Sequence, residues 1–119
     1  MKKTVVIGAS DNPERYSYRA VVSLLRTDHA VVAVGNKEGE IEGIKILTGQ
    51  PAIADVDTVT LYVGPKHQPP LYNYILSLHP KRIIFNPGTE NPEFENMAVS
   101  KGIEVLPACT LTMLSVGNY

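Results

Sequence analysis

Three consecutive residues, Gly8-Ala9-Ser10, stand between an apolar run and a helical pattern that begins at Ser17. A glycine at the end of a strand lets the backbone approach a pyrophosphate, and the start of the next helix supplies free N–H groups and a partial positive charge. The segment lacks the G-x-G-x-x-G pattern of dinucleotide enzymes, because Ser10 and Pro13 occupy two of its positions. The loop favours phosphate binding, and a tight strand-to-helix turn without a ligand is equally consistent with it.

A lysine follows the second apolar run, in the sequence Val34-Gly35-Asn36-Lys37. Nicotinamide dinucleotide folds normally place Asp or Glu at this point, where the carboxylate binds a ribose 2′-hydroxyl. Lys37 instead suits a ribose that carries a phosphate, as in NADP or in coenzyme A with its 3′-phosphate. The alternative interpretation is a solvated lysine in a glycine-rich loop.

Several other polar side chains near these loops fit either a ligand contact or an ordinary surface role. Arg15 or Arg19 is placed to meet a phosphate, and Tyr16 or Tyr18 is placed to stack on an adenine ring. His67 follows the third apolar run and has the chemistry to contact a phosphate, although a solvated loop histidine is the commoner case.

Residue types suited to catalysis or metal binding are sparse. His29, His67 and His79 are far apart in the sequence, and the single cysteine, Cys109, has no second thiol or histidine at metal-ligand spacing. No nucleophile with an adjacent base and no Walker-type P-loop can be identified. We therefore expect no metal site and no catalysis by this chain alone, and we expect Cys109 to be an inert packing residue.

Five apolar runs of strand length organise the chain. They are continuous rather than alternating, as in parallel strands that are covered on both faces, and helical patterns lie between them. We predict an α/β fold: a three-layer, doubly wound, Rossmann-like domain with about five parallel strands in the order 3-2-1-4-5. The five runs are Thr4–Gly8, Ala30–Val34, Thr58–Val63, Arg82–Phe85 and Ile103–Leu106.

The helical segments carry start and stop signals. Ser17 is the predicted N-cap of the first helix, with Asn12-Pro13 as an earlier candidate start. Pro69-Pro70 opens the second helix, and the third runs from an Asn91 cap to a Gly102 stop. Between residues 35 and 57 the chain is irregular, and we expect a loop with an extended piece at 45–47 and one helical turn near 51–54.

Composition limits the remaining choices. With 119 residues, 44% of them hydrophobic, the chain is expected to fold as one domain over 1–119. Eleven basic against 12 acidic residues give a net charge of −1, which provides no electrostatic footprint for nucleic acid. We expect no membrane segment and no signal peptide, and a lone cysteine makes the cytoplasm the default location. The expected partner is a small molecule.

Together these segments resemble the stand-alone CoA-binding-domain proteins, small relatives of the CoA-binding (Rossmann-like) domain of the succinyl-CoA synthetase alpha subunit. The resemblance covers nearly the whole chain. It is carried by Val6-Ile7-Gly8-Ala9-Ser10, Ser17-Tyr18-Arg19, Asn36-Lys37, Gly43 with Asp55-Val56-Asp57, and Val63 with Pro65.

The resemblance implies that coenzyme A or an acyl-CoA binds at the carboxyl edge of the sheet. In this family the Gly-x-Ser loop cradles the phosphates of coenzyme A, the basic residue after the second strand approaches the adenosine phosphates, and the later loops flank the rest of the ligand. Ligase activity is not implied, because the phosphohistidine of the synthetase lies in a separate domain. The implied ligand-binding residues are Gly8, Ala9, Ser10, Ser17, Asn36, Lys37, Val63, Pro65, Asn86 and Gly88.

Two other functions stay open. An NADP-binding oxidoreductase-like domain would share the phosphate loop and Lys37, but it also needs a site for hydride transfer. A protein-interaction module with a vestigial nucleotide pocket would use an apolar surface, and the segment 110–114 is suited either to a homodimer or enzyme partner or to covering the domain's own core. Binding assays with coenzyme A and NADP, and the size of the protein in solution, separate these functions.

Overall fold

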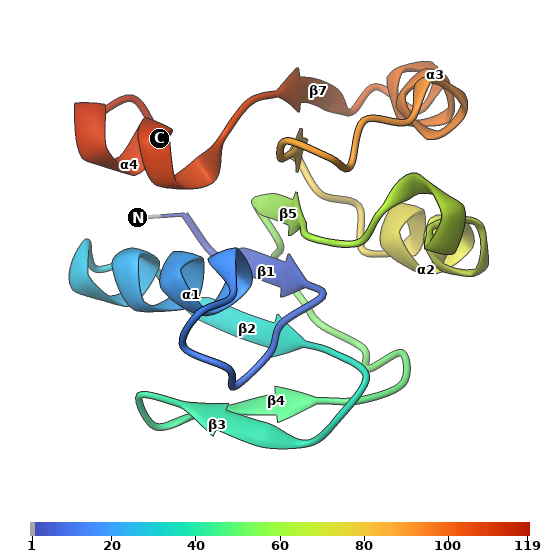
Figure 1. The fold of residues 1–119 in the computed structure, drawn as a ribbon. Helices are drawn as coiled ribbons and strands as arrows, with labels where there is room; N and C mark the ends of the chain where they lie inside the picture. Colours follow the sequence, from blue (N-terminus) through green and yellow to red (C-terminus); the bar gives the residue numbers. More distant parts are fainter. Residues whose placement is uncertain (1) are drawn as a thin grey trace.

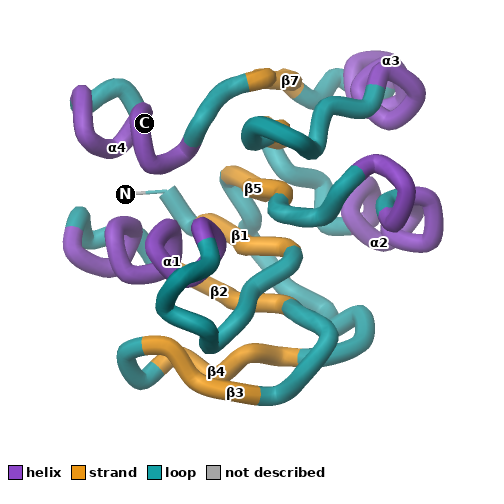
Figure 2. Tube along the Cα trace, in the orientation of Figure 1, coloured by secondary structure: helices purple, strands orange, loops and turns teal. Residues whose placement is uncertain are grey.

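A central sheet covered by helices on both faces forms the computed structural model, which describes residues 2–119 (Figure 1). Helices α1 and α4 lie on one face of the sheet, and α2 and α3 lie on the other (Figure 2). The α/β, three-layer, Rossmann-like class is therefore confirmed. Within residues 2–119 the elements are β1 (Thr4–Ile7), α1 (Tyr16–Arg26), β2 (Val31–Val34), β3 (Gly39–Ile41), β4 (Ile44–Leu47), β5 (Thr58–Leu61), the 3₁₀ turns η1 (Pro65–His67) and η2 (Pro69–Leu71), α2 (Tyr72–Ser77), β6 (Arg82–Phe85), α3 (Pro92–Ser100), β7 (Glu104–Pro107) and α4 (Thr110–Val116).

The sheet has seven strands over the described residues, in the order β3-β4-β2-β1-β5-β6-β7. All neighbours pair in parallel except β3 and β4, which form an antiparallel hairpin. The predicted order 3-2-1-4-5 was wrong, because it placed the strand that begins at Thr58 next to the second strand. In the structure this strand, β5, pairs with β1, so the five predicted strands stand in the order 2-1-3-4-5.

The hairpin explains this difference. Ile41 and Ile46 are buried, and Ile46 pairs with Ala33, so β4 occupies the outer edge of β2. With that edge taken, the chain returns to the free side of β1. A two-residue turn, Glu42-Gly43, closes the hairpin with φ values of 49° and 86°, as a type I′ turn requires. The extended piece at 45–47 is confirmed, whereas the helical turn predicted near 51–54 does not form.

The core lies on both sides of the sheet. On one face Val5, Ile7, Leu61 and Phe85 contribute to a cluster with residues of α2 and α3, in which the Tyr72 and Phe94 rings stack with centroids 4.5 Å apart. On the other face a second cluster joins residues of β1 and β2 to α1 and α4. Because both faces are covered, the strands read as continuous apolar runs, as predicted.

Two helix starts differ in how they are capped. Asn91 caps α3 as predicted, since its side chain accepts a hydrogen bond from the Phe94 amide (3.2 Å). The predicted Ser17 cap was wrong: α1 begins at Tyr16 after Arg15, and Ser17 is buried in its first turn. A turn around Asn12 leads the chain into the helix early, because the amides of Glu14 and Arg15 both bond to it (3.0 Å each).

The last segment covers the domain's own core. Helix α4 packs against α1, and Leu114 and Tyr119 join the second cluster. Of the two roles considered for residues 110–114, the structure therefore shows the internal one. No helix described between residues 2 and 119 has the length and apolarity to cross a bilayer.

Candidate functional site

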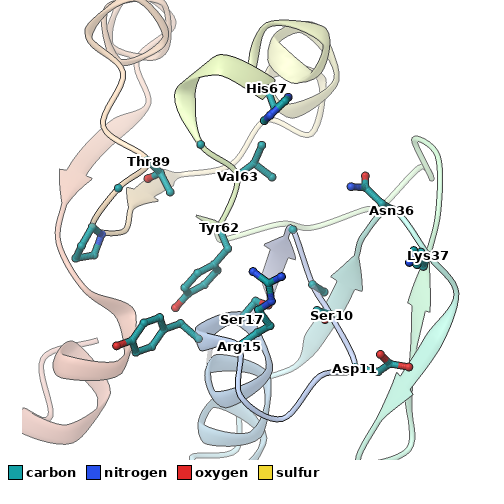
Figure 3. A pocket seen from close by; sticks show the side chains of 16 residues that line it. Ser10, Asp11, Arg15, Ser17, Asn36, Lys37, Tyr62, Val63, His67 and Thr89 are labelled. Carbon is teal, nitrogen blue, oxygen red and sulfur yellow. The ribbon is translucent and has the colours of Figure 1, made fainter.

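A cleft of about 610 Å³ opens at the carboxyl ends of the parallel strands (Figure 3). Its walls come from the loops that follow β1, β2, β5 and β6. From β1 the chain first moves to β2 on one side and later to β5 on the other, so the cleft sits where the strand order reverses. This is the position at which open α/β sheets bind their ligands.

Two glycines bring the loop backbones together at the base of the cleft. Gly8 has φ 93°, and a Cβ there would lie 2.9 Å from the carbonyl carbon and oxygen of Tyr62. The amides of Gly8 and Ala9 both donate to the carbonyl of Val34 (2.9 Å each). A Cβ at Gly35 would clash with the Ala9 carbonyl oxygen. No other residue type allows these three loops to pack so closely.

Three residues that line the cleft have backbone amides without a hydrogen-bond acceptor in the described chain. Within residues 2–119, no hydrogen-bond acceptor is found for the backbone N–H groups of Ser10, Asp11 and Ser17. Ser17 lies in the first turn of α1, an 11-residue helix, where the helix dipole adds partial positive charge. An unpaired N–H group needs an acceptor, and a phosphate oxygen supplies one.

The charged groups around the cleft are mostly basic. Arg15, Lys37 and His67 line it, against a single carboxylate, Asp11. The ion pairs found among residues 2–119 are Arg26–Glu42 and Lys81–Asp57, so neither Arg15 nor Lys37 is neutralised by a partner in the described chain. The cleft is therefore suited to an anionic ligand.

A buried amide holds the wall formed by the later loops. Gln68 is fully buried and donates from Nε2 to the carbonyls of Val63 (2.9 Å) and Thr89 (2.8 Å). Its Oε1 accepts from Nδ2 of Asn91 (3.0 Å), which also donates to the hydroxyl of Tyr72 (2.7 Å). The loop after β5 is thus tied to the loop after β6, and both line the cleft.

Comparison with known proteins assigns the family. The family model described as "CoA binding domain" matches residues 2–115. The chain belongs to the CoA-binding domain family. A search of the curated proteins found no match. A crystal structure described as that of an uncharacterized protein is 50% identical, with a TM-score of 0.98, and the alignment covers 100% of this chain and 98% of that one.

More distant structures share the fold. The structure of cell-free ID.343 from Thermus thermophilus is 21% identical, with a TM-score of 0.85 and coverage of 99% of this chain and 90% of that one. A dinucleotide-forming acetyl-coenzyme A synthetase 1 from Ca. Korarchaeum cryptofilum, in complex with phosphate and ADP, is 21% identical, with a TM-score of 0.69. The alignment with it covers 90% of this chain but 25% of that one, so a similar fold forms one part of a larger enzyme.

In this CoA-binding domain most of the predicted ligand residues lie together in the cleft, and two do not. Pro65 is exposed at the start of η1, outside the lining. Asn86 is buried beneath the cleft, where Nδ2 donates to Oγ1 of Thr60 (2.6 Å) and Oδ1 accepts from the Thr110 amide (2.9 Å). The predicted residues that line the cleft are Gly8, Ala9, Ser10, Ser17, Asn36, Lys37, Val63 and Gly88.

Sequence reasoning did not assign all of the lining. Arg15, Tyr16 and His67 were among the alternatives, and the structure places all three at the cleft. Asp11 and Tyr62 were missed as site residues, and so was Thr89. A signal for Tyr62 exists in the alternation of polar residues Thr58, Thr60 and Tyr62, which puts three hydroxyls on one face of β5 and its continuation.

Two titratable groups near the cleft have shifted pKa values. Burial raises the pKa of the Tyr62 hydroxyl well above its ordinary value, so this group stays protonated at physiological pH. Burial also raises the pKa of the Cys109 thiol, but the Thr112 hydroxyl and the amides at the start of α4 outweigh burial and leave that pKa below its usual value. Cys109 does not line the cleft, and among the described residues no group of His, Cys, Asp and Glu side chains is arranged to hold a metal.

Proposed function

We propose that this domain binds coenzyme A or an acyl-CoA in the cleft at the carboxyl edge of its sheet. The observation that carries this proposal is the set of free amides at Ser10, Asp11 and Ser17, in a cleft that is also lined by two unneutralised basic side chains, Arg15 and Lys37. That arrangement fits a ligand with several phosphates. The match of the family model over residues 2–115 supports coenzyme A among such ligands.

Each part of the cleft is assigned a part of the ligand. The free amides of Ser10, Asp11 and Ser17 take the pyrophosphate, with Arg15 beside them, while the amides of Gly8 and Ala9 are already bonded to the Val34 carbonyl. Lys37, next to Asn36, takes the phosphate on the ribose. Val63 and Gly88 border the remaining length of the ligand, while Asn86 supports the floor from below.

We propose a binding role and not a catalytic one. The hydroxyl groups of the lining belong to serine, threonine and tyrosine, and the candidate bases among the lining residues are Asp11 and His67. The Asp11 carboxylate accepts no hydrogen bond from these hydroxyls in the described chain. Across residues 2–119, His67 makes no side-chain hydrogen bond to any of these hydroxyls. A nucleophile paired with a base, which covalent catalysis requires, is not assembled among the described residues.

A thermal-shift comparison tests the proposal. Coenzyme A at 100 times its dissociation constant stabilises the folded protein by about 2.7 kcal/mol, which raises the Tm by roughly ten degrees in a domain of this size. Dephospho-CoA is expected to bind about tenfold more weakly, because it lacks the phosphate that Lys37 contacts.

Lys37→Ala provides the matched test of that contact. This variant is expected to bind coenzyme A and dephospho-CoA with equal affinity, while Lys45→Ala, which changes an exposed lysine outside the cleft, keeps the tenfold preference. Stabilisation by NADP but not by coenzyme A would replace this proposal with the NADP-binding alternative. No shift with any nucleotide would favour an interaction module.

A further inference from the structure

One tyrosine hydroxyl in the interior lacks a hydrogen-bond partner. Among the side-chain nitrogen and oxygen atoms buried within residues 2–119, Tyr62 Oη and Arg82 Nη2 have none. The guanidinium of Arg82 is otherwise engaged, because Nε donates to Oγ1 of Thr58 (2.7 Å) and the group lies 4.4 Å from the centre of the Tyr119 ring. The Tyr62 hydroxyl lies near the Thr60 and Thr110 hydroxyls, which lower its pKa, but it forms a hydrogen bond of regular geometry with neither.

The neighbouring hydroxyls are already committed to each other. Thr60 and Thr110 are near enough to the Tyr62 hydroxyl to lower its pKa, but their own hydroxyls bond to one another at 2.7 Å and neither forms a regular hydrogen bond with it. Asn86 holds both residues, donating to Oγ1 of Thr60 (2.6 Å) and accepting from the Thr110 amide (2.9 Å). The Tyr62 side chain packs against the second core cluster, as Leu114 does. A buried hydroxyl in such a place destabilises the fold.

The other interior tyrosines show that this is an exception. The hydroxyl of Tyr74 donates to the carbonyl of Pro51 (2.6 Å), that of Tyr72 accepts from Asn91 (2.7 Å), and that of Tyr119 bonds to Thr4 (2.6 Å). None of these three residues lines the cleft, whereas Tyr62 forms part of its floor (Figure 3). The unpartnered hydroxyl therefore coincides with the candidate binding site.

We propose that Tyr62 is a ligand-binding donor: when the ligand enters, its side chain turns toward the cleft and the hydroxyl donates to a carbonyl oxygen of the pantetheine arm. This inference rests on the proposed function. The ligand then supplies the hydrogen bond that the protein alone lacks, so the free protein bears a cost that binding removes.

A carbonyl oxygen suits this donor better than a phosphate does. In the proposed binding mode the free amides at Ser10 and at the start of α1 take the phosphates. The hydroxyl comes from a largely apolar cluster, in which a neutral carbonyl is desolvated at far lower cost than a phosphate anion. Tyr62 lies between Ser10 and Ser17 on one side of the cleft and Thr89 on the other (Figure 3).

Tyr62→Phe tests the proposal, with Tyr74→Phe as its matched control. Stability is measured as the Tm of the ligand-free protein, and affinity is measured by titration with coenzyme A, acetyl-CoA and adenosine 3′,5′-bisphosphate, which has no pantetheine arm. Tyr62→Phe is expected to keep or raise the Tm and to lose about fivefold in affinity for coenzyme A and acetyl-CoA, with unchanged affinity for the bisphosphate. Tyr74→Phe removes a formed hydrogen bond, so its Tm falls while all three affinities stay the same.

Other outcomes overturn the inference in distinct ways. A Tm for Tyr62→Phe that falls as far as that of Tyr74→Phe means that the hydroxyl is bonded within the free protein. An equal loss of affinity for the bisphosphate assigns the hydroxyl to phosphate, and an unchanged affinity for coenzyme A removes it from the site; in both cases the proposed function stands. Wild-type protein that binds none of the three ligands contradicts the proposed function and this inference together.

Two outcomes that support the inference also identify the acceptor. If Tyr62→Phe loses affinity for acetyl-CoA alone, the acceptor is the thioester carbonyl. If it loses affinity for both coenzyme A and acetyl-CoA, the acceptor is an amide carbonyl of the pantetheine arm.

Discussion

At Gly8 the backbone has φ 93°, and a Cβ would lie 2.9 Å from the Tyr62 carbonyl group. Gly8→Ala is therefore expected to lower the free energy of unfolding by about 3 kcal/mol, since strain and a backbone clash act together. It also displaces the amides that would meet the pyrophosphate. Urea denaturation followed by circular dichroism measures the loss of stability.

Gly43→Ala is the control for backbone strain alone. Gly43 has φ 86° but nothing lies within 4 Å of the position of a Cβ. We expect a loss of about 1 kcal/mol and unchanged ligand binding. Equal losses in the two variants would show that close packing against Tyr62 contributes nothing.

The stability of the domain is expected to depend on pH through His29. Burial lowers the pKa of His29, and the positive charges of Lys2 and Arg82 lower it further, so that they outweigh the backbone hydrogen bond with Lys2, which raises it. The unfolded chain, with a pKa near 6.5, then binds protons more readily than the folded protein. This contribution to stability is complete above that pH and is lost as the pH falls below it.

The measurement is the Tm of wild type and of His29→Gln at about pH 7.5 and about pH 5.5. The Tm of wild type is expected to fall further between these two pH values than the Tm of the variant. A variant with the same or a steeper dependence would exclude His29 as the source.

Single residues were predicted where their chemistry is local. Gly8 ends the first apolar run, and Lys37 comes three residues after the end of the second. Their positions at the sheet edge could therefore be predicted from the sequence. Ser17 was misassigned as a cap because the turn at Asn12 starts the helix earlier. Tyr62 was missed because no sequence pattern shows that a hydroxyl is left without a partner; that depends on how Thr60, Thr110 and Asn86 meet in space.

At the scale of elements, one side chain joins the two loops that form the far wall of the cleft. Gln68→Leu leaves the carbonyls of Val63 and Thr89 and the amide of Asn91 without their partner. We expect the free energy of unfolding to fall by about 3 kcal/mol, because buried polar groups are left unpaired. Faster hydrogen exchange in the loops after β5 and β6 is the accompanying sign.

Gln50→Leu is the matched control, since its side chain is exposed and its Nε2 reaches a carbonyl at 3.5 Å. This variant is expected to keep the stability of wild type. If Gln68→Leu is equally stable, the two loops are held by apolar packing and not by the amide.

Some helices and strands were predicted from the sequence, and others were predicted only in part. The five parallel strands were found as apolar runs of strand length, and α3 was found from its Asn91 cap and Gly102 stop. The β3–β4 hairpin was found only in part. Its strands have three and four residues, and its burial depends on Ile41 and Ile46 reaching a neighbour, β2, that lies apart from them in the sequence.

For the whole molecule, the layer architecture followed from alternating strands and helices, but the strand order did not. The order depends on which edge of the sheet is free when β5 forms, and the hairpin decides that by covering β2. The error in strand order does not change the predicted location of the cleft. In both the predicted and the observed order, the direction of the chain through the sheet reverses at β1. Eight of the ten predicted ligand residues therefore meet in one cleft although the order was wrong.

We propose that this cleft binds coenzyme A through its phosphates and not through its arm alone. Calorimetric titration of the purified, ligand-free protein with coenzyme A, followed by the same titration in the presence of saturating adenosine 3′,5′-bisphosphate, tests it most directly. We predict saturable binding at one site per chain, and we predict that the bisphosphate competes with it. Heat of binding that is absent with coenzyme A, or that is unaffected by the bisphosphate, would contradict the claim.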